Sequence, residues 1–149
     1  MRREPLPLDK IRARHHALHQ QIRALEQLLE QREEPDEARV REALVLFEGF
    51  EPMLEEHFAV EERGGYFSDV LKVAPRFTRW ATRLERNHGD FRARLQRLLE
   101  LAHNAVDAPD KWSKVISGVA EFLQKLKEHE AEENDLVRAA FMDDLAPGD

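Results

Sequence analysis

Residues 44–61 read LVLFEGFEPMLEEHFAVE, and this stretch contains the pattern that decides the fold. Its apolar side chains recur every three or four residues, which is the spacing of one face of an amphipathic α-helix. His57 and Glu61 fall on this same face, where further leucines would be expected. Burying a polar group without a partner costs roughly 2–7 kcal/mol, so we expect both side chains to find partners inside the fold.

The same design recurs along the chain. Proline and glycine breaks divide it into four amphipathic segments, and we predict helices at about residues 8–31, 36–63, 75–105 and 109–143. A single histidine stands on the apolar stripe of each: His15, His57, His88 and His129. Long helices with short connections fold most simply as an all-α, up-down-up-down four-helix bundle. The longest connection, residues 66–74, has room for one helical turn at Ser68–Lys72. We expect residues 1–149 to form one domain.

The spacing of these histidines indicates an internal repeat. His57 follows His15 by 42 residues, and His129 follows His88 by 41. Each half of the chain therefore has a lone histidine on its first helix and a His-x-x-x-Glu pair on its second, the later pair being His129 and Glu133. With a helical rise of ~1.5 Å per residue, all six groups fall at a similar depth, toward one end of the bundle core.

This constellation predicts a metal site in the core. Histidine and glutamate at i and i+4 lie on one helix face. Imidazoles and carboxylates without thiolates suit iron, manganese or zinc better than copper(I), and spacing alone leaves iron and manganese both open. Two carboxylates from opposite helices could each bridge two metals, whereas a single zinc would not need six ligands. The predicted ligands are His15, His57, Glu61, His88, His129 and Glu133.

Some of these residues also have simpler explanations, and other residues are further candidates. One His-x-x-x-Glu pair is usually an ion pair, but matched residues on all four helices favour a shared cation. Among the four stripe histidines, the Glu-x-x-His motif of ferritin-like bundles occurs once, at Glu85–His88, and is rejected because such a site needs it twice. His19, one turn after His15, is a possible additional ligand, and Tyr66 could approach the open end of the site or cap the core. His16 and His103 fall off the stripes and are expected to be solvated.

Composition excludes several classes of protein. The chain has no cysteine, so disulfides, thiolate metal sites and cysteine nucleophiles are excluded, and a cytoplasmic location is expected. No apolar run approaches the ~20 residues of a membrane span, and the first residues lack the apolar core of a signal peptide. The net charge of −7 argues against nucleic acid and anionic membranes as partners. The arginines of residues 76–86 are expected to form a solvated face that pairs with the acidic helices.

These residues resemble the hemerythrin-like domains of the His–His–Glu type. The matching segments are RHHAL (14–18), EHFAVEE (56–62), NHGDF (87–91) and HEAEE (129–133). The resemblance covers nearly the whole chain. It implies a four-helix bundle that holds two iron ions as an oxo- or hydroxo-bridged centre. It also implies that the four histidines are terminal ligands and that Glu61 and Glu133 are bridging carboxylates.

The chain departs from the oxygen-carrying hemerythrins, which have a His-x-x-x-His pair on the third helix and His-x-x-x-x-Asp on the fourth. Here Arg92 follows His88 by four residues and Leu84 precedes it by four. One terminal imidazole is therefore missing, unless His19 replaces it from the first helix. This departure puts reversible oxygen carriage in doubt and leaves room for redox chemistry or sensing.

The leading functional hypothesis is a non-haem di-iron protein that binds dioxygen or a related small diatomic ligand, in sensing, storage or delivery. A core lined by phenylalanine and leucine would admit small apolar gases and limit water. One alternative is a di-iron enzyme that reduces peroxide or nitric oxide or oxidises ferrous iron. Another is a regulatory module whose stability responds to iron, since metal binding adds to folding free energy. The sequence leaves the physiological ligand, any protein partner and the oligomeric state open.

Overall fold

The computed structural model describes residues 8–30, 37–63 and 66–142. Within these ranges the chain is almost entirely helical and contains no β-strand. The long helices are α1 (Leu8–Leu29), α2 (Glu37–Arg63), α4 (Thr78–Ala105) and α5 (Trp112–Met142), and α3 (Tyr66–Val73) is short. Two 3-10 turns, Pro75–Phe77 and Pro109–Lys111, lead into α4 and α5.

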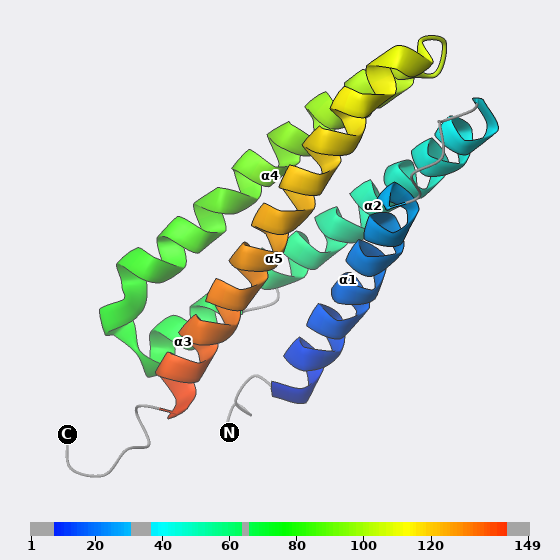
Figure 1. The fold of residues 1–149 in the computed structure, drawn as a ribbon. Helices are drawn as coiled ribbons and strands as arrows, with labels where there is room; N and C mark the ends of the chain where they lie inside the picture. Colours follow the sequence, from blue (N-terminus) through cyan, green and yellow to red (C-terminus); the bar gives the residue numbers. More distant parts are fainter. Residues whose placement is uncertain (1–7, 31–36, 64–65, 143–149) are drawn as a thin grey trace.

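The four long helices form a bundle in which neighbours run in alternating directions (Figure 1). α1 packs against α2 and α5, and α4 packs against the same two helices. The short helix α3 lies at one end of the bundle and contacts α4 and α5 near the start of the former and the end of the latter (Figure 1). This arrangement confirms the predicted all-α, up-down-up-down fold.

The helix bounds differ from the predicted ones mainly where proline lies near a helix start. Helices were expected to begin at residues 75 and 109, but Pro75 and Pro109 both lie in 3-10 turns, and the α-helices begin at Thr78 and Trp112. Proline has a fixed φ and no N–H, so it suits the tighter turn that precedes a helix. The predicted bounds at residues 31, 36 and 143 lie outside the described residues.

The segment expected to be a connection with one helical turn is instead the helix α3, which spans Tyr66–Val73. Its apolar side chains Phe67, Val70 and Leu71 follow helical spacing, and the first two are buried. They pack against α4 and α5 at the end of the bundle. Burial of this short apolar face explains why the segment is helical although it is only eight residues long.

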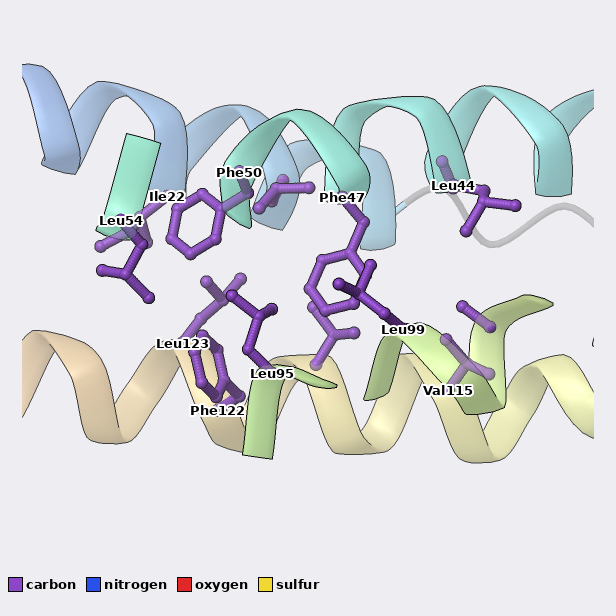
Figure 2. Packing of buried hydrophobic residues seen from close by; sticks show 14 of the residues in the cluster. Ile22, Leu44, Phe47, Phe50, Leu54, Leu95, Leu99, Val115, Phe122 and Leu123 are labelled. Carbon is purple, nitrogen blue, oxygen red and sulfur yellow. The ribbon is translucent and has the colours of Figure 1, made fainter. Parts of the chain in front are cut away.

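Two apolar clusters fill the bundle, and they are separated along its axis. The larger, here called the main core, joins α1, α2, α4 and α5, and Figure 2 shows Phe47 and Phe50 of α2 facing Leu95 of α4 and Phe122 of α5. The smaller, here called the end core, joins α3 to α4 and α5 through Phe67, Val70, Ala74, Ala81, Leu84, Leu136, Val137 and Ala140.

The polar stripe residues lie between these two cores. Along α4, Leu84 belongs to the end core and Phe91 to the main core, and His88 falls between them. Along α5, Leu126 belongs to the main core and Leu136 to the end core. The fold therefore holds a polar layer with apolar packing on both sides. Among the described residues, no helix combines the length and hydropathy that a bilayer crossing would require.

Candidate metal centre

The six residues predicted as metal ligands meet in the polar layer. α1 supplies His15, α2 supplies His57 and Glu61, α4 supplies His88, and α5 supplies His129 and Glu133. All six residues are buried, and none has more than 7% of its surface exposed. Their donor atoms form two groups, and within each group the atoms lie within 4.8 Å of one another. Glu61 and Glu133 belong to both groups.

Each shared carboxylate directs one oxygen to each group. Glu61 Oε1 lies 2.6 Å from His57 Nε2, and its Oε2 lies 3.1 Å from His88 Nε2. Glu133 Oε2 lies 3.7 Å from His15 Nε2, and its Oε1 lies 3.4 Å from His88 Nε2 and contacts His129 Nε2. Two ligands bound at right angles to one cation, each ~2.1 Å from it, lie ~3 Å apart. The donor atoms of each group thus have the spacing of ligands around a cation, and the two groups share two carboxylates.

Glu130 is a seventh donor that the sequence did not reveal. Its side chain is 0% exposed and belongs to the group around His15 and His57. Its Oε1 accepts a hydrogen bond from His57 Nε2 (3.0 Å), and its Oε2 lies 3.0 Å from His15 Nε2. Only His129 and Glu133 of this segment were predicted to lie on the buried face, so Glu130 was not among the predicted ligands. Two signals could have found it: the three-residue spacing to Glu133 and the alignment of position 130 with apolar Phe58 in the repeat.

The two lone histidines, His15 and His88, are each oriented by a polar residue that comes directly after one of the shared glutamates in the sequence. His15 Nδ1 donates to Asn134 Oδ1 (2.8 Å), and His88 Nδ1 donates to Glu62 Oε1 (3.2 Å). In the neutral ring, a donating Nδ1 leaves Nε2 with a lone pair directed at the centre. This outer contact is typical of histidines that bind metals.

Burial and close charges shift the pKa values of the histidines in opposite directions. Burial disfavours the charged form of His15, but hydrogen bonds with Glu133 and Glu61 outweigh it and raise its pKa to about 10. The same balance, with Glu130 and Glu61 as partners, raises the pKa of His57 to about 9. Burial, together with the nearby His88, lowers the pKa of His129 to about 4. At neutral pH the protons thus gather on the pair that faces Glu130.

The two shared carboxylates shift oppositely as well. Burial raises the pKa of Glu61, but hydrogen bonds with His15, His57 and His88 outweigh it and hold the value well below normal. Burial and repulsion from Glu130 and Glu61 raise the pKa of Glu133 well above its ordinary value. Three carboxylates in one buried layer therefore call for positive charge, which protons or cations can supply.

Several of these donor atoms are placed to bind a cation but do not form ordinary hydrogen bonds with one another. Both oxygens of Glu61, both ring nitrogens of His129 and Glu130 Oε2 are buried and have no hydrogen bond of ordinary geometry, although most of them lie close to a partner of opposite charge. Leaving such a group unsatisfied costs about 1–3 kcal/mol, and coordination of a cation would remove that cost. Imidazole and carboxylate donors without thiolates suit iron, manganese or zinc. The chemistry of the donor set therefore fits metal cations.

The other candidate residues lie apart from the donor groups. His19 is half-buried and belongs to neither group. The side chain of Tyr66 lies outside the described residues. His16 is exposed beside Gln20, and His103 is exposed and pairs with Glu48 (3.0 Å), as expected for histidines off the stripes. Of the basic residues on α4, Arg83 pairs with Glu132 of α5 (3.2 Å from Nη1), in line with the expected solvated face.

A pocket of about 620 Å³ opens between α4 and α5 beside the centre. His129 and Phe91 line it together with charged residues that include Asp90, Arg94 and Lys125. His129 also belongs to the donor group around His88. The pocket therefore reaches the centre at His129.

The fold and the site together define a helical-bundle protein with a buried histidine–carboxylate site for cations. Comparison with protein families gives the same class: the hemerythrin HHE cation-binding domain matches residues 6–141. The chain therefore belongs to this hemerythrin-like family of cation-binding domains. Comparisons with curated proteins and with solved structures gave no match.

Proposed function

We propose that the centre holds two iron ions and that the protein binds dioxygen or a related small diatomic ligand there. The proposed terminal ligands are His15, His57 and Glu130 for one ion and His88 and His129 for the other, with Glu61 and Glu133 bridging both. The observation that carries this proposal is the division of each shared carboxylate between the two histidine pairs. Bound ferrous ions would supply the electrons that reversible binding of dioxygen requires.

The side of His88 and His129 is the better place for a small exogenous ligand. That donor group has four members, whereas the group around His15 and His57 has five because Glu130 joins it. Aromatic rings surround it: Phe58 stacks on His88 at 3.9 Å between ring centroids, and Phe91 lies 5.2 Å from His129. These rings limit access of water to the donor group, while the pocket that His129 lines brings solvent to its edge.

Metal analysis with an optical spectrum tests the proposal. Protein loaded anaerobically with ferrous iron should hold about two irons per chain, as a site of this size allows. On oxidation it should show near-ultraviolet bands of a bridged diferric centre. Replacing buried His129 by Ala should lower the iron content, whereas replacing exposed His103 by Ala should leave it unchanged. Iron below about half an equivalent in the wild-type protein would contradict a two-ion centre.

An iron-responsive regulatory module is the second candidate. It is supported by the unsatisfied buried donors, because a cation that satisfies them stabilises only the folded chain. A rise in melting temperature on iron addition would favour it, and equal melting temperatures would argue against it. A spectral change that reverses when oxygen is removed would favour oxygen binding, whereas rapid turnover with peroxide would favour an enzyme.

A further inference from the structure

Arg92 of α4 lies one turn after His88 and makes three hydrogen bonds to α2. Its Nη1 and Nη2 donate to Glu62 Oε1 (3.1 Å) and Oε2 (2.9 Å), and its Nε donates to Glu55 Oε2 (2.8 Å). The pair with Glu62 is bidentate, a geometry that fixes the carboxylate in both position and plane. Arg92 itself is partly exposed, and these three hydrogen bonds go to residues outside the donor groups of the centre.

Two residues that contact Arg92 also hold His88. Glu62 Oε1 accepts the hydrogen bond from His88 Nδ1 (3.2 Å), so it holds the edge of the ring. Phe58 stacks on the face of the ring at 3.9 Å with an angle of 10° between the planes. The guanidinium carbon of Arg92 lies 5.5 Å from the centroid of Phe58 on α2. The edge and the face of His88 are therefore both held by residues that Arg92 contacts.

The matching position in the other half of the repeat lacks this arrangement. His15 Nδ1 donates to the amide of Asn134, which is neutral. A carboxylate acceptor draws the ring proton more strongly than an amide does, so the ring donates more electron density through Nε2. The two lone histidines, although related by the repeat, therefore differ in their outer partners.

We propose that Arg92 is a positioning residue for the metal position at His88, which it serves by clamping Glu62 and the ring of Phe58. This inference rests on the proposed function, because it assigns Arg92 to one of the two metal positions of the proposed centre. Glu62 makes His88 an electron-rich ligand, and Arg92 holds that carboxylate in place beside Nδ1, whereas the position at His15 does not depend on Arg92. Removing the clamp weakens one metal position and leaves the other intact.

Anaerobic titration of the full chain with Co²⁺ tests this, because the d–d bands of Co²⁺ report its coordination without iron or oxygen chemistry. Wild type should bind in two steps. Arg92→Gln should weaken one step by roughly 10–100-fold, the usual effect of losing an outer partner of a metal ligand, and alter its bands. Arg92→Lys, which keeps the charge but not the bidentate geometry, should restore part of the affinity. Arg83→Gln removes a comparable pair between α4 and Glu132 and should change neither step.

The double variant shows whether Arg92 acts through Glu62. In a Glu62→Gln background, Arg92→Gln should lose most of its effect on Co²⁺ affinity, because the two residues serve one contact. Circular dichroism of every apo variant checks that the bundle has formed. Two unchanged Co²⁺ steps in folded Arg92→Gln, or equal weakening of both steps, would overturn the inference and leave the metal centre standing. Wild-type protein that binds no Co²⁺ would overturn the proposed centre and this inference with it.

Discussion

Glu130 and Phe58 are equivalent positions in the repeat, and the difference between them makes the two halves of the centre unequal. Each follows a histidine that faces the centre, and each is buried. Glu130 adds a carboxylate to the group around His15 and His57. Phe58 instead covers the ring of His88. A single pair of positions thus gives one side an extra anionic donor and the other an apolar wall.

We expect Glu130→Gln to weaken the metal position at His15 and His57 selectively. The amide has nearly the same shape but no charge, so the loss should reach at least tenfold in affinity, about 1.4 kcal/mol. Anaerobic calorimetric titration with ferrous iron would measure it as a change in one of two binding steps. Glu128→Gln is the matched control, since Glu128 is exposed on the same helix. Unchanged binding in Glu130→Gln would remove Glu130 from the set of ligands.

Residue type and spacing predicted the meeting of six side chains, but they could not predict their outer partners. His57 with Glu61 and His129 with Glu133 follow from the helical period, and the structure brings them together. Glu130 was missed because the sequence does not show how wide the buried face of the helix is, and therefore whether the residue next to His129 is buried too. Asn134 and Glu62 are polar residues beside an apolar stripe, and the sequence does not show what they contact. The packing of α1 against α5 brings Asn134 to the ring of His15, and the packing of α2 against α4 brings Glu62 to the ring of His88.

At the scale of elements, the long helices were predictable and α3 was not. Four stripes of apolar residues over 22 or more residues each leave little choice of structure. α3 has eight residues, too few for a stripe to be told from a loop. It is helical because its apolar face closes the end of the bundle beyond the polar layer, where Phe67 lies 5.8 Å from the ring of His88.

We expect Phe67→Ala in α3 to destabilise the protein and to loosen the metal centre. Removing a buried phenylalanine ring typically costs about 3–5 kcal/mol, and here it would also let water reach His88 from the end of the bundle. Urea unfolding would measure the first effect, and the rate of iron loss to a chelator would measure the second. Val73→Ala, on the same helix and 40% exposed, should change neither. Iron loss at the wild-type rate would show that α3 does not shield the centre.

The whole molecule is organised around the polar layer, because each of the four long helices contributes at least one donor to it. The helices carry these groups between two apolar cores, so the layer is assembled only when the bundle closes. No single helix, and neither half of the repeat, provides a complete donor group. Binding of a cation is therefore coupled to folding of the entire bundle, and its free energy adds to the stability of the whole chain.

The pH dependence of stability should therefore differ between apo and metal-loaded protein. In the apo protein the pKa values of His15 and His57 are raised to about 10 and about 9. Between about pH 6.5, the ordinary histidine value, and these values the folded chain binds more protons than the unfolded chain. The stability that these protons confer is complete below pH 6.5 and is lost as the pH rises through 9 and 10.

Metal cations reverse this trend, because they take the lone pairs that the protons occupy. Each cation bound at His15 and His57 must displace protons, so its apparent affinity rises with pH over the same interval. The melting temperature of apo protein should fall from pH 6.5 to 9.5, and the gain from added metal should grow. Anaerobic thermal melts with and without Mn²⁺ would show this. His57→Gln should flatten the apo curve, while His103→Gln should not. Parallel curves for apo and loaded protein would mean that protons and cations do not compete for one layer.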